Sequence, residues 1–376
     1  MMVITNERIS VLLVSALPPP WGGVSSLTEV MMRRGLPFPY EYRIVDTTIW
    51  PRRLFEPTPI SVGEVKRILE ILVKCFCELA FQKIKIMHFN FTPTRLSLPR
   101  DFLIVYLSGL FRVPVVIQIH GDLASIDFKG WIGIRRKLLS GIIKRSNCVL
   151  VLNKSTSEYI SQFVQNAVTL YLPNFVESVE LIPRKSGKIE FRHQQLMKVI
   201  FVGGVTPAKG IWELLHAILR TTGIDLLVVG QPVKDIKKEI EDFVKQNGIN
   251  ERVRIMGAKD REEVFELMMH SDVFCLPSYK EGLPISILEA MICEMPIVAT
   301  AVGGIPDVVD EQLGGYLVPP RDVDALISAL ERIRDNPTIR IEMGKYNRKK
   351  AIENYEYSNV ISMLTNVYSE LLNTVS

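Results

Sequence analysis

The alternation of short apolar strands with longer helices constrains the fold of this chain more than any other feature. In the first half, segments of helical periodicity separate six short β-rich runs: Ile9–Ser15, Tyr42–Val45, Ile84–His88, Val115–His120, Cys148–Leu152 and Val168–Leu172. The alternation restarts in the second half with five more: Val199–Val202, Asp225–Val229, Val253–Met256, Val273–Leu276 and Ile297–Thr300. This rhythm is typical of parallel, doubly wound sheets. The sequence therefore predicts an α/β protein with two Rossmann-like domains.

The boundary between the two domains is predicted from a polar, basic stretch that follows Leu172-Pro173-Asn174 and has no clean periodicity. We expect a first domain over residues 1–174, a linker over 175–197, a second domain over 198–355 and a closing segment over 356–376. The closing segment contains an amphipathic helix at about Ser358–Leu372. A length of 376 residues suits two domains of ~100–200 residues each.

Composition excludes several classes of protein. Apolar residues make up 47% of the chain, while a charged fraction of 23% argues against a disordered chain and against an integral membrane bundle. The most apolar run, from Phe102 to His120, is interrupted by Arg112 and Pro114, so we expect a helix, a turn and a buried strand there. The start of the chain lacks the pattern of a secretion signal, and the five cysteines lack metal-ligand spacing. We therefore expect buried, reduced thiols, as at Cys75 and Cys77, and a cytoplasmic protein.

Charge is distributed unevenly along the chain. Residues 1–174 carry 21 Lys and Arg against 12 Asp and Glu, a balance of +9, whereas the remainder carries 24 against 29, a balance of −5. This split disfavours a nucleic-acid binder and favours a first domain that faces an anionic membrane or a phosphate-bearing acceptor. The segment Trp131–Arg145 combines an apolar and a cationic stripe. It fits a helix lying on an anionic membrane and equally a core helix with a solvated basic face. The segment from Trp50 to Phe55 has a similar mixture.

In the first half, the loops that follow strands carry two candidate binding elements. Gly22-Gly23 lies between the first strand and the first helix, where paired glycines allow close approach of a ligand and the helix start offers N–H groups to an anion. An ordinary tight turn explains this pair as well. His120 closes a strand and can bind a sugar hydroxyl, although a buried histidine with a structural partner is the commoner case. His88 is also predicted to end a strand and carries the same ambiguity.

In the second half, Lys209 lies in a glycine-bearing loop between the first strand and the first helix, a position that suits a diphosphate. A solvated surface lysine is the alternative, and the loop is not a Walker A motif. A second glycine turn, Val302–Pro306, follows a strand and is expected to line the same crevice. Parallel sheets bind ligands at the carboxyl ends of their strands, so these loops are predicted to contribute to one site.

Two glutamates eight positions apart, Glu281 and Glu289, bracket a predicted helix start at Pro284. Proline fits a first helical position because it lacks the N–H that would be left without an acceptor there. Glu289 then lies ~7.5 Å along the helix axis, while Glu281 stays on the loop. One carboxylate can hold a ribose while the other reaches a sugar.

These residues together resemble a retaining glycosyltransferase of family 4, which has the two-domain GT-B fold with its active site in the cleft between the domains. The most specific part runs from Ser278 to Pro319, where Glu281 and Glu289 form an E-x7-E motif and Val302–Asp307 matches the following glycine loop. Weaker matches are collinear with it: Gly22-Gly23, His120-Gly121, Leu172-Pro173-Asn174, Lys209-Gly210 and Val229-Gly230. The final segment from Tyr357 resembles the terminal helix that returns to the first domain in this family.

The resemblance implies transfer of a hexose-type sugar from a UDP- or GDP-sugar to a glycan or lipid-linked acceptor, as in cell-surface polysaccharide or glycolipid synthesis. It implies no cofactor and no essential metal, and a location in the cytoplasm or on the cytoplasmic face of a membrane. By position, Glu289 would bind the ribose, Glu281 the donor sugar and Lys209 the diphosphate. The implied catalytic residues are His120 and Glu281, and the implied donor-binding residues are Gly22, Gly23, Lys209, Gly282, Leu283 and Glu289.

Two positions depart from the family pattern. Gly204 stands where the family usually has an arginine, and Gln231-Pro232 follows Gly230 where a second glycine is common. A nucleotide-sugar-binding protein without turnover, or another sugar-nucleotide enzyme such as an epimerase, therefore remains an alternative. Asp322-Val323-Asp324 has the form of a D-x-D metal motif, but it opens a helical run and is predicted to cap that helix.

Overall fold

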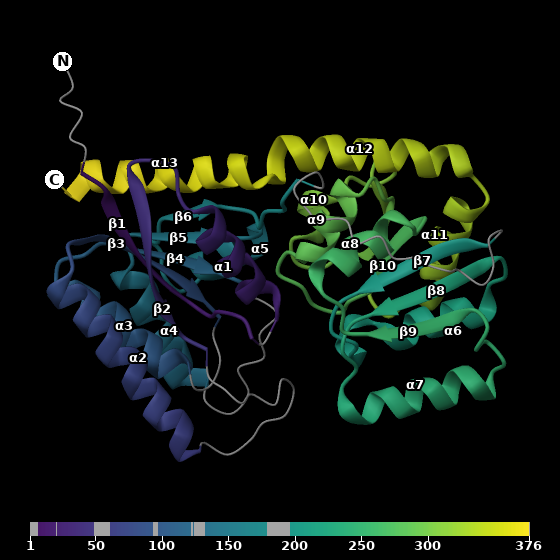
Figure 1. The fold of residues 1–376 in the computed structure, drawn as a ribbon, viewed down its shortest axis with the longest axis horizontal. Helices are drawn as coiled ribbons and strands as arrows, with labels where there is room; N and C mark the ends of the chain where they lie inside the picture. The colour runs from purple at the N-terminus through teal and green to yellow at the C-terminus, as the bar shows by residue number, and fades with distance from the viewer. Residues whose placement is uncertain are drawn as a thin grey trace. The chain divides into compact units, whose positions relative to one another are not determined.

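The computed structural model describes residues 7–19, 21–48, 61–92, 97–121, 123, 132–178 and 196–375. The chain divides into two compact units (Figure 1). Unit 1 consists of Met1–Pro173 together with Val360–Ser376, and unit 2 consists of Asn174–Asn359. Each unit contains a six-stranded sheet in which every pair of neighbouring strands is parallel. The predicted architecture of two doubly wound sheets is confirmed.

Unit 1 is built on a sheet with the strand order β2-β1-β3-β4-β5-β6. Its strands are β1 (Ile9–Ser15), β2 (Tyr40–Asp46), β3 (Ile84–Phe91), β4 (Val115–Ile119), β5 (Cys148–Val151) and β6 (Thr169–Tyr171). Its helices are α1 (Gly23–Arg34), α2 (Val62–Phe81), α3 (Ser97–Leu110), α4 (Ile132–Arg145), α5 (Lys154–Ser161) and most of α13 (Tyr357–Val375).

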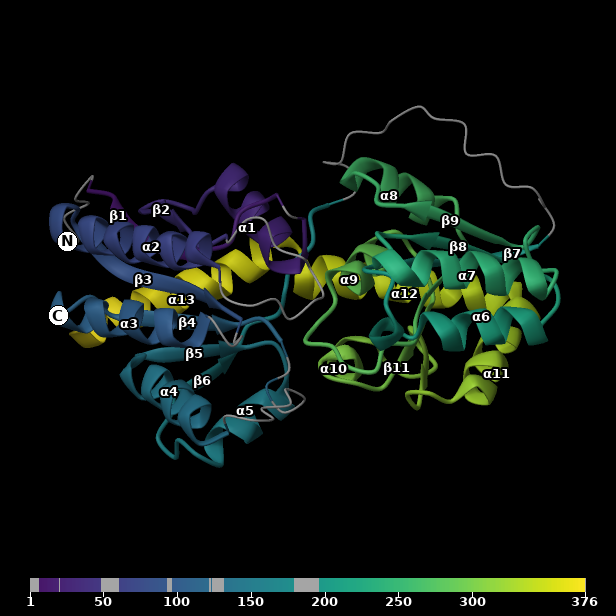
Figure 2. The same cartoon turned by 90° about the horizontal axis from the view of Figure 1, so that it is seen from below.

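The two faces of the unit 1 sheet are covered by different helices. Helices α2, α3 and α4 follow one another across one face (Figure 2). Their buried side chains share an apolar core with Met87 and Phe89 of β3. Because successive strand residues point to opposite faces, His88 lies on the other face, where it contacts Tyr368 of α13. The strands are nearly fully buried, and successive apolar side chains point to opposite faces of the sheet. Both faces can therefore pack against helices.

Unit 2 is built on a sheet with the strand order β12-β11-β10-β7-β8-β9. Its strands are β7 (Met197–Val202), β8 (Ile224–Val229), β9 (Val253–Gly257), β10 (Val273–Leu276), β11 (Ile297–Thr300) and β12 (Gly315–Val318). Its helices are η3 (Pro207–Lys209), α6 (Ile211–Arg220), α7 (Lys234–Gln246), α8 (Arg261–Met269), α9 (Ile285–Ile292), α10 (Ile305–Val308), α11 (Val323–Arg334) and α12 (Pro337–Tyr355).

Several expectations from the sequence require correction. Strand β12 was not predicted: it has four residues and begins at Gly315, where an added Cβ would lie 1.8 Å from the Ile297 carbonyl oxygen. Strand β3 continues to Phe91, so His88 lies inside a strand and not at its end. Cys77 is exposed, whereas Cys75 is buried and its burial raises its pKa to about 12. No helix within the described residues is both long and apolar enough to cross a membrane.

Candidate functional site

In unit 2, the candidate residues gather where the direction of the chain through the sheet reverses. The chain runs outward from β7 through β8 to β9 and then returns to place β10 on the opposite side of β7. Open parallel sheets bind ligands at the carboxyl ends of the strands beside such a reversal. Lys209 follows β7, Glu281 follows β10 and Gly303 follows β11. Three loops that are distant in sequence are thereby adjacent at one edge of the sheet.

Lys209 and Glu281 form an ion pair, with Lys209 Nζ 2.5 Å from Glu281 Oε1. The lysine side chain is 32% exposed and the glutamate side chain 8%. The backbone joins the two loops as well, because Tyr279 N donates to the carbonyl oxygen of Ala208 at 2.9 Å. Lys209 is therefore a partly exposed lysine held in an ion pair, and its contact with a diphosphate stays a prediction. The pair combines a fixed carboxylate with an ammonium group whose other protons remain able to bind an anion.

The Glu281 carboxylate is held by further contacts. Ser278 Oγ donates to the same Oε1 atom at 2.6 Å, and Thr300 Oγ1 in turn donates to the Ser278 carbonyl oxygen. The glycine turn packs against the backbone of this loop, since Gly304 N donates to Gly282 O at 2.6 Å. Gly303 has a φ of 56°, and a Cβ there would lie 1.9 Å from the Glu281 carbonyl oxygen. The two halves of the sequence motif are thus in direct contact.

Glu289 lies on α9, one turn inside the helix. The helix begins at Ile285, and Pro284 is its N-cap residue with extended backbone, so the predicted start at Pro284 was one residue early. Arg261 of α8 places its Nε 3.6 Å from Glu289 Oε1, and it also forms an ion pair with the buried Glu177. Burial raises the pKa of Glu289, while Arg261 acts in the opposite direction. Sequence reasoning did not identify Arg261.

The loop between the two glutamates is fixed by Asn174. This side chain is buried and its Nδ2 donates to the Leu283 carbonyl oxygen at 2.7 Å. The contact orients the peptide just before α9, where the first-turn amides of Ile285 and Ser286 lack helical acceptors. Asn174 had been noted only as part of the Leu172-Pro173-Asn174 match. Its role could have been suspected because a buried amide side chain requires partners.

In unit 1, the reversal of strand order lies between β1 and β3, and residues at the carboxyl ends of β1, β3 and β4 contact one another. Gly22 is the N-cap residue of α1, which begins at Gly23. The Gly22 amide donates to Ser25 Oγ at 2.9 Å, so the cap already uses this N–H. Gly22 has a φ of −164°, an extended conformation open to any residue. The pair therefore starts α1, and its contact with a ligand stays a prediction.

His120 follows β4 directly and is half-buried. Its Nε2 lies 3.0 Å from Asn90 Oδ1, Asn90 Nδ2 donates to Ser15 Oγ at 2.9 Å, and Ser15 Oγ lies 2.6 Å from Thr28 Oγ1. Thr28 Oγ1 donates to the carbonyl oxygen of Val24 at 2.8 Å.

The direction of this chain of hydrogen bonds is set at its end. A carbonyl oxygen only accepts hydrogen bonds, so the hydroxyl proton of Thr28 is used in the bond to Val24. The Ser15 hydroxyl must therefore donate to Thr28, and it accepts from Asn90. Asn90 then presents its oxygen to His120, whose Nε2 must carry a proton. In a neutral His120 the lone pair therefore lies on Nδ1. The sequence analysis missed Asn90 because the predicted third strand ended at His88, and no motif marks Ser15 or Thr28.

The second histidine considered in the sequence has a structural environment. His88 is completely buried, and its Nδ1 lies 2.5 Å from the hydroxyl of Tyr368. Burial, reinforced by the proximity of His120, lowers the pKa of His88 to about 3. The neutral His88 thus holds α13 against the sheet.

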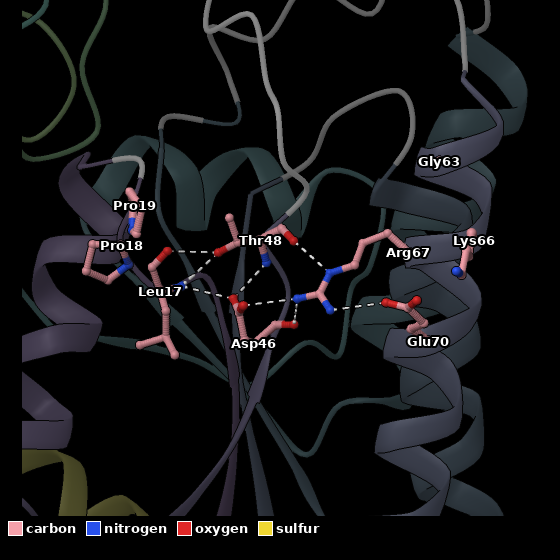
Figure 3. A pocket seen from close by; sticks show the side chains of 9 residues that line it. All are labelled: Leu17, Pro18, Pro19, Asp46, Thr48, Gly63, Lys66, Arg67 and Glu70. Atoms are coloured by element: carbon pink, nitrogen blue, oxygen red, sulfur yellow. Dashed lines mark hydrogen bonds and ion pairs between the residues drawn. The ribbon is translucent and has the colours of Figure 1, made fainter.

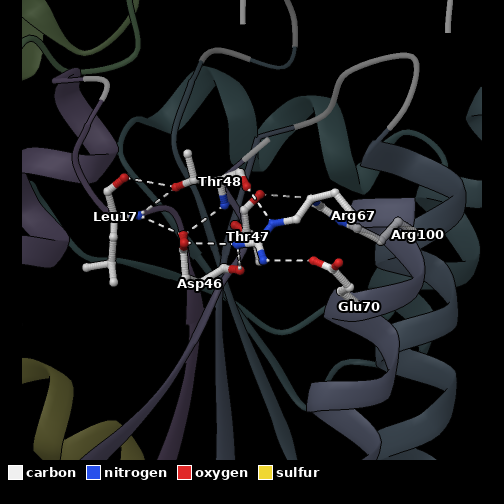
Figure 4. Close-up of polar contacts among 7 residues, drawn as sticks. All are labelled: Leu17, Asp46, Thr47, Thr48, Arg67, Glu70 and Arg100. Atoms are coloured by element: carbon white, nitrogen blue, oxygen red, sulfur yellow. Dashed lines mark hydrogen bonds and ion pairs between the residues drawn. The ribbon is translucent and has the colours of Figure 1, made fainter. Parts of the chain in front are cut away.

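A hollow of about 380 Å³ lies at the carboxyl ends of β1 and β2 beside the first turns of α2 (Figure 3). The Asp46 carboxylate accepts from the backbone amides of Leu17 and Thr48 and pairs with Arg67 at 3.0 Å. Arg67 also donates to the carbonyl oxygen of Thr48 and pairs with Glu70 (Figure 4). These mutual contacts fix the loops after β1 and β2, and the charges that line the hollow largely cancel.

Two other segments bear on the sequence predictions. The apolar stripe of α4 is buried through Leu139, Ile142 and Ile143, so α4 packs into the core and turns its basic residues outward. Asp322 caps α11 by accepting from Ala325 N at 2.9 Å, which confirms the predicted capping role. Trp131 and the segment from Trp50 to Phe55 lie outside the described residues.

Part of this chain is similar to a known family of proteins. Residues 185–350 match the family model described as "Glycosyl transferases group 1". The MMP alpha-(1->4)-mannosyltransferase of Mycolicibacterium hassiacum is 27% identical over 229 residues, which cover 60% of this chain and 54% of that protein. This chain therefore spans about half of that relative's length.

Two solved structures show the fold of the whole chain. Sucrose-phosphate synthase from Thermosynechococcus elongatus superposes with a TM-score of 0.76 at 20% identity, covering 98% of this chain and all of that one. HepE of Anabaena, solved in complex with UDP-glucose, has a TM-score of 0.74 at 15% identity, covering 96% of this chain and all of that one. The chain has the GT-B fold, and the residues that match the group 1 glycosyltransferase model lie in unit 2.

Proposed function

We propose that this chain is a retaining glycosyltransferase that moves a hexose-type sugar from a UDP- or GDP-sugar to a glycan or lipid-linked acceptor. The observation that carries the proposal is the Lys209–Glu281 pair, braced by Ser278 at the strand-order reversal of a group 1 glycosyltransferase domain. HepE, which shares the fold, was solved with UDP-glucose. A nucleoside diphosphate sugar is the ligand that these groups suit.

Each group of this pair has a distinct role in the proposed reaction. Departure of the nucleoside diphosphate places negative charge on its phosphate oxygens, and Lys209 can donate to them while another of its N–H groups keeps its hydrogen bond to Glu281. The Glu281 carboxylate accepts hydrogen bonds, so it suits sugar hydroxyls next to the anomeric carbon. Because Glu281 Oε1 is already held by Lys209 and Ser278, its orientation is set before the substrate arrives. This preorganisation lowers the cost of reorganising the site in the transition state.

Glu289 suits the ribose of the donor. Ribose hydroxyls can donate to a carboxylate, and Arg261 partly offsets the rise in the pKa of Glu289 that burial causes. The backbone amides at Gly282 and Leu283 and the first turn of α9 would bind phosphate or sugar oxygens. In unit 1, a neutral His120 would accept a hydrogen bond from a sugar hydroxyl at Nδ1, and the helix start at Gly22 and Gly23 suits an anion such as a phosphate.

The proposed mechanism uses neither a covalent intermediate nor a metal ion. In retaining glycosidases a second carboxylate attacks the anomeric carbon. Here Glu281 is bound to an ammonium group and a hydroxyl, which lowers its nucleophilicity, so we assign it to binding. The acceptor hydroxyl then attacks the anomeric carbon from the face that the diphosphate leaves. The new glycosidic C–O bond forms as the bond to the diphosphate oxygen breaks, and the hydroxyl proton passes to the departing phosphate oxygen. Lys209 supplies the positive charge that a metal ion supplies in metal-dependent enzymes.

The test begins with donor binding by the full chain. UDP- and GDP-sugars are screened for thermal stabilisation, and one nucleotide series should stabilise the protein by mass action. Lys209→Met should abolish most of that stabilisation, whereas Lys237→Met, at an exposed lysine on α7, should leave it unchanged. Equal stabilisation of both variants would contradict the proposed diphosphate site. An NMR spectrum of the product that showed an inverted anomeric linkage would reject retention, and loss of activity in EDTA would reject metal independence.

Binding without turnover is the second candidate, and Gly204 is the observation that favours it. The loop after β7 lacks the guanidinium that would strengthen anion binding at this position. Release of nucleoside diphosphate in the presence of glycan and lipid-linked acceptors separates the two functions. A binding protein would be stabilised by the donor but would release no diphosphate with any acceptor.

A further inference from the structure

One cation of unit 2 lies between two carboxylates. Arg261, the first residue of α8, forms an ion pair with Glu177 and places its Nε 3.6 Å from Glu289 Oε1. The two contacts differ in kind. Arg261 donates a hydrogen bond to Glu177, whereas a separation of 3.6 Å exceeds a hydrogen bond and leaves only electrostatic attraction. The guanidinium is therefore bonded to Glu177, while the carboxylate of Glu289 keeps its capacity to accept hydrogen bonds from a ligand.

The exposure of the three side chains separates their roles. The Glu177 side chain is 3% exposed, Glu289 is 14% exposed and Arg261 is 26% exposed. Glu177 is thus closed to a ligand, whereas a group as small as a hydroxyl can reach Glu289. A buried carboxylate requires a partner such as Arg261, but an ion pair formed for stability alone needs only one carboxylate. The position of Glu289 beside the same guanidinium points to a further purpose.

The backbone holds Glu177 in place. Val176 N donates to the carbonyl oxygen of Tyr355 at 2.8 Å, and Tyr357 N donates to the carbonyl oxygen of Val176 at 3.0 Å. The residue before Glu177 is therefore hydrogen-bonded on both sides to the junction of α12 and α13. Because its backbone is fixed, the Glu177 carboxylate has little freedom to follow the guanidinium towards another partner.

Arg261 is restrained from a second direction. Asp260 caps α8 at its start, so the backbone of Arg261 is fixed. The guanidinium lies over the ring of the fully buried Phe265, with Cζ 5.5 Å from the ring centroid. Stacking on Phe265 and the hydrogen bond to Glu177 together hold the guanidinium short of Glu289.

The charge of this cluster selects the kind of group that it can bind. One guanidinium between two carboxylates leaves one negative charge in excess. The adjacent pair of Lys259 and Glu263 cancels. An excess negative charge repels a phosphate and attracts uncharged hydrogen-bond donors. The two neighbouring hydroxyls of a ribose are such donors, and a deoxyribose has fewer of them.

We propose that Glu177 is a positioning residue that keeps Arg261 away from Glu289 and thereby makes the site select ribonucleotide donors over deoxyribonucleotide donors. Without Glu177, the guanidinium would turn to Glu289 and form a bidentate pair with it. That pair would occupy the oxygen atoms that the ribose hydroxyls need. Glu177 acts through Arg261 and touches no part of the donor. The inference rests on the assignment of Glu289 to the donor ribose in the proposed function.

The test uses calorimetry on the full chain at pH 8. It compares the affinity for UDP and GDP with the affinity for their 2′,3′-dideoxy forms, which keep the diphosphate but lack both ribose hydroxyls. The wild type should bind the ribonucleotide of one series at least about tenfold more tightly than its dideoxy form, because a hydrogen bond to a charged group contributes roughly that much. Glu177→Met has similar length and no acceptor. It should lower this ratio to about twofold or less and leave the affinity for the dideoxy form unchanged.

Two further variants separate positioning from a structural role. Glu177→Gln keeps an acceptor for Arg261 and should retain most of the ratio. Glu177→Met combined with Arg261→Met removes the competing guanidinium, so the ratio should rise above that of Glu177→Met alone. Measurement at pH 8 favours the ionised form of Glu289, because the loss of Arg261 leaves the rise in its pKa by burial unopposed. A double variant that binds more weakly than Glu177→Met, or equal weakening for both nucleotide forms, would overturn the proposal.

Controls distinguish failure of this inference from failure of the proposed function. Glu331→Gln, at an ion-paired glutamate of α11, should keep the wild-type ratio, and Glu289→Gln should lose it. A wild type that binds neither form, or binds both equally, would overturn the ribose assignment and this inference together. A ratio that Glu289→Gln abolishes and Glu177→Met leaves intact would refute the inference alone. A crystal structure of Glu177→Met should bring Arg261 within about 3 Å of Glu289. A guanidinium that stayed at 3.6 Å would also refute it.

Discussion

Acidification should destabilise unit 1 through one buried histidine. His88 is neutral in the folded protein, with a pKa lowered to about 3 by burial and by the nearby His120, and it contacts Tyr368 and Gln118. In the unfolded chain a histidine titrates at about 6.5. The unfolded state therefore binds a proton that the folded state excludes. The stability contributed by neutral His88 is fully present above pH 6.5 and is lost as the pH falls towards 3.

The size of the effect follows from that difference in pKa. Each pH unit below 6.5 lowers the free energy of unfolding by about 1.4 kcal/mol for one such group, so the two units down to pH 4.5 remove about 3 kcal/mol. His88→Gln retains a polar side chain and removes the titration. The stability difference between wild type and variant should therefore change by about 3 kcal/mol between pH 7.5 and pH 4.5. Subtraction also cancels groups such as Asp101, whose pKa burial raises to about 6.

The assay must report on unit 1 alone. Of the four tryptophans, Trp212 belongs to unit 2 and the other three to unit 1, so a Trp212→Phe background makes tryptophan fluorescence report on unit 1. Urea unfolding is followed at both pH values for the wild type and for His88→Gln in this background. His270→Gln, in unit 2, serves as the control. A difference between wild type and His88→Gln that is equal at both pH values would refute the assignment of the acid sensitivity to His88.

Two further predictions concern the candidate sites. Gly303→Ala should destabilise unit 2 more than Gly248→Ala: both have positive φ, which costs roughly 1–2 kcal/mol, but only Gly303 would also place its Cβ 1.9 Å from the Glu281 carbonyl oxygen. Thermal unfolding measures this, and equal losses would contradict the close contact. Asn90→Leu removes the oxygen that holds the Nε2 proton of His120, so neutral His120 should become a mixture of its two tautomers. ¹⁵N spectra of the imidazole measure this change, and an unchanged spectrum would show that Asn90 does not set the tautomer.

The parts of the fold that the sequence predicted are those governed by periodicity. Eleven of the twelve strands coincide with apolar, β-branched runs, because a parallel sheet buries both faces of its strands. The exception, β12, opens with a glycine because the backbone of Ile297 approaches too closely for a side chain. Glycine has a low propensity for strands. The close contact that requires Gly315 therefore also weakens the sequence signal from which β12 could have been predicted. No periodicity argument would recover it.

The candidate residues were easier to predict than the contacts between them. Lys209 and Glu281 were each assigned to a sugar-nucleotide site, but their ion pair joins positions 72 apart and depends on the order of β7 and β10. Arg261 reaches Glu289 from α8, which no motif marks. Helix α2 posed a different problem: its apolar residues cover two faces, and periodicity does not tell which face is buried. The buried face emerged only when the packing was known.

The contacts of α13 with unit 1 have a consequence for the synthesis of the protein. The segment Val360–Ser376 belongs to unit 1 but leaves the ribosome only after all of unit 2. Until then Tyr368 is absent, and His88 and Tyr40 lack the ring that they contact in the folded protein. Unit 2 has its complete sequence earlier than unit 1, although unit 1 is begun first. The amino-terminal half expressed alone would therefore expose a face of its own sheet, because the segment Val360–Ser376 completes unit 1.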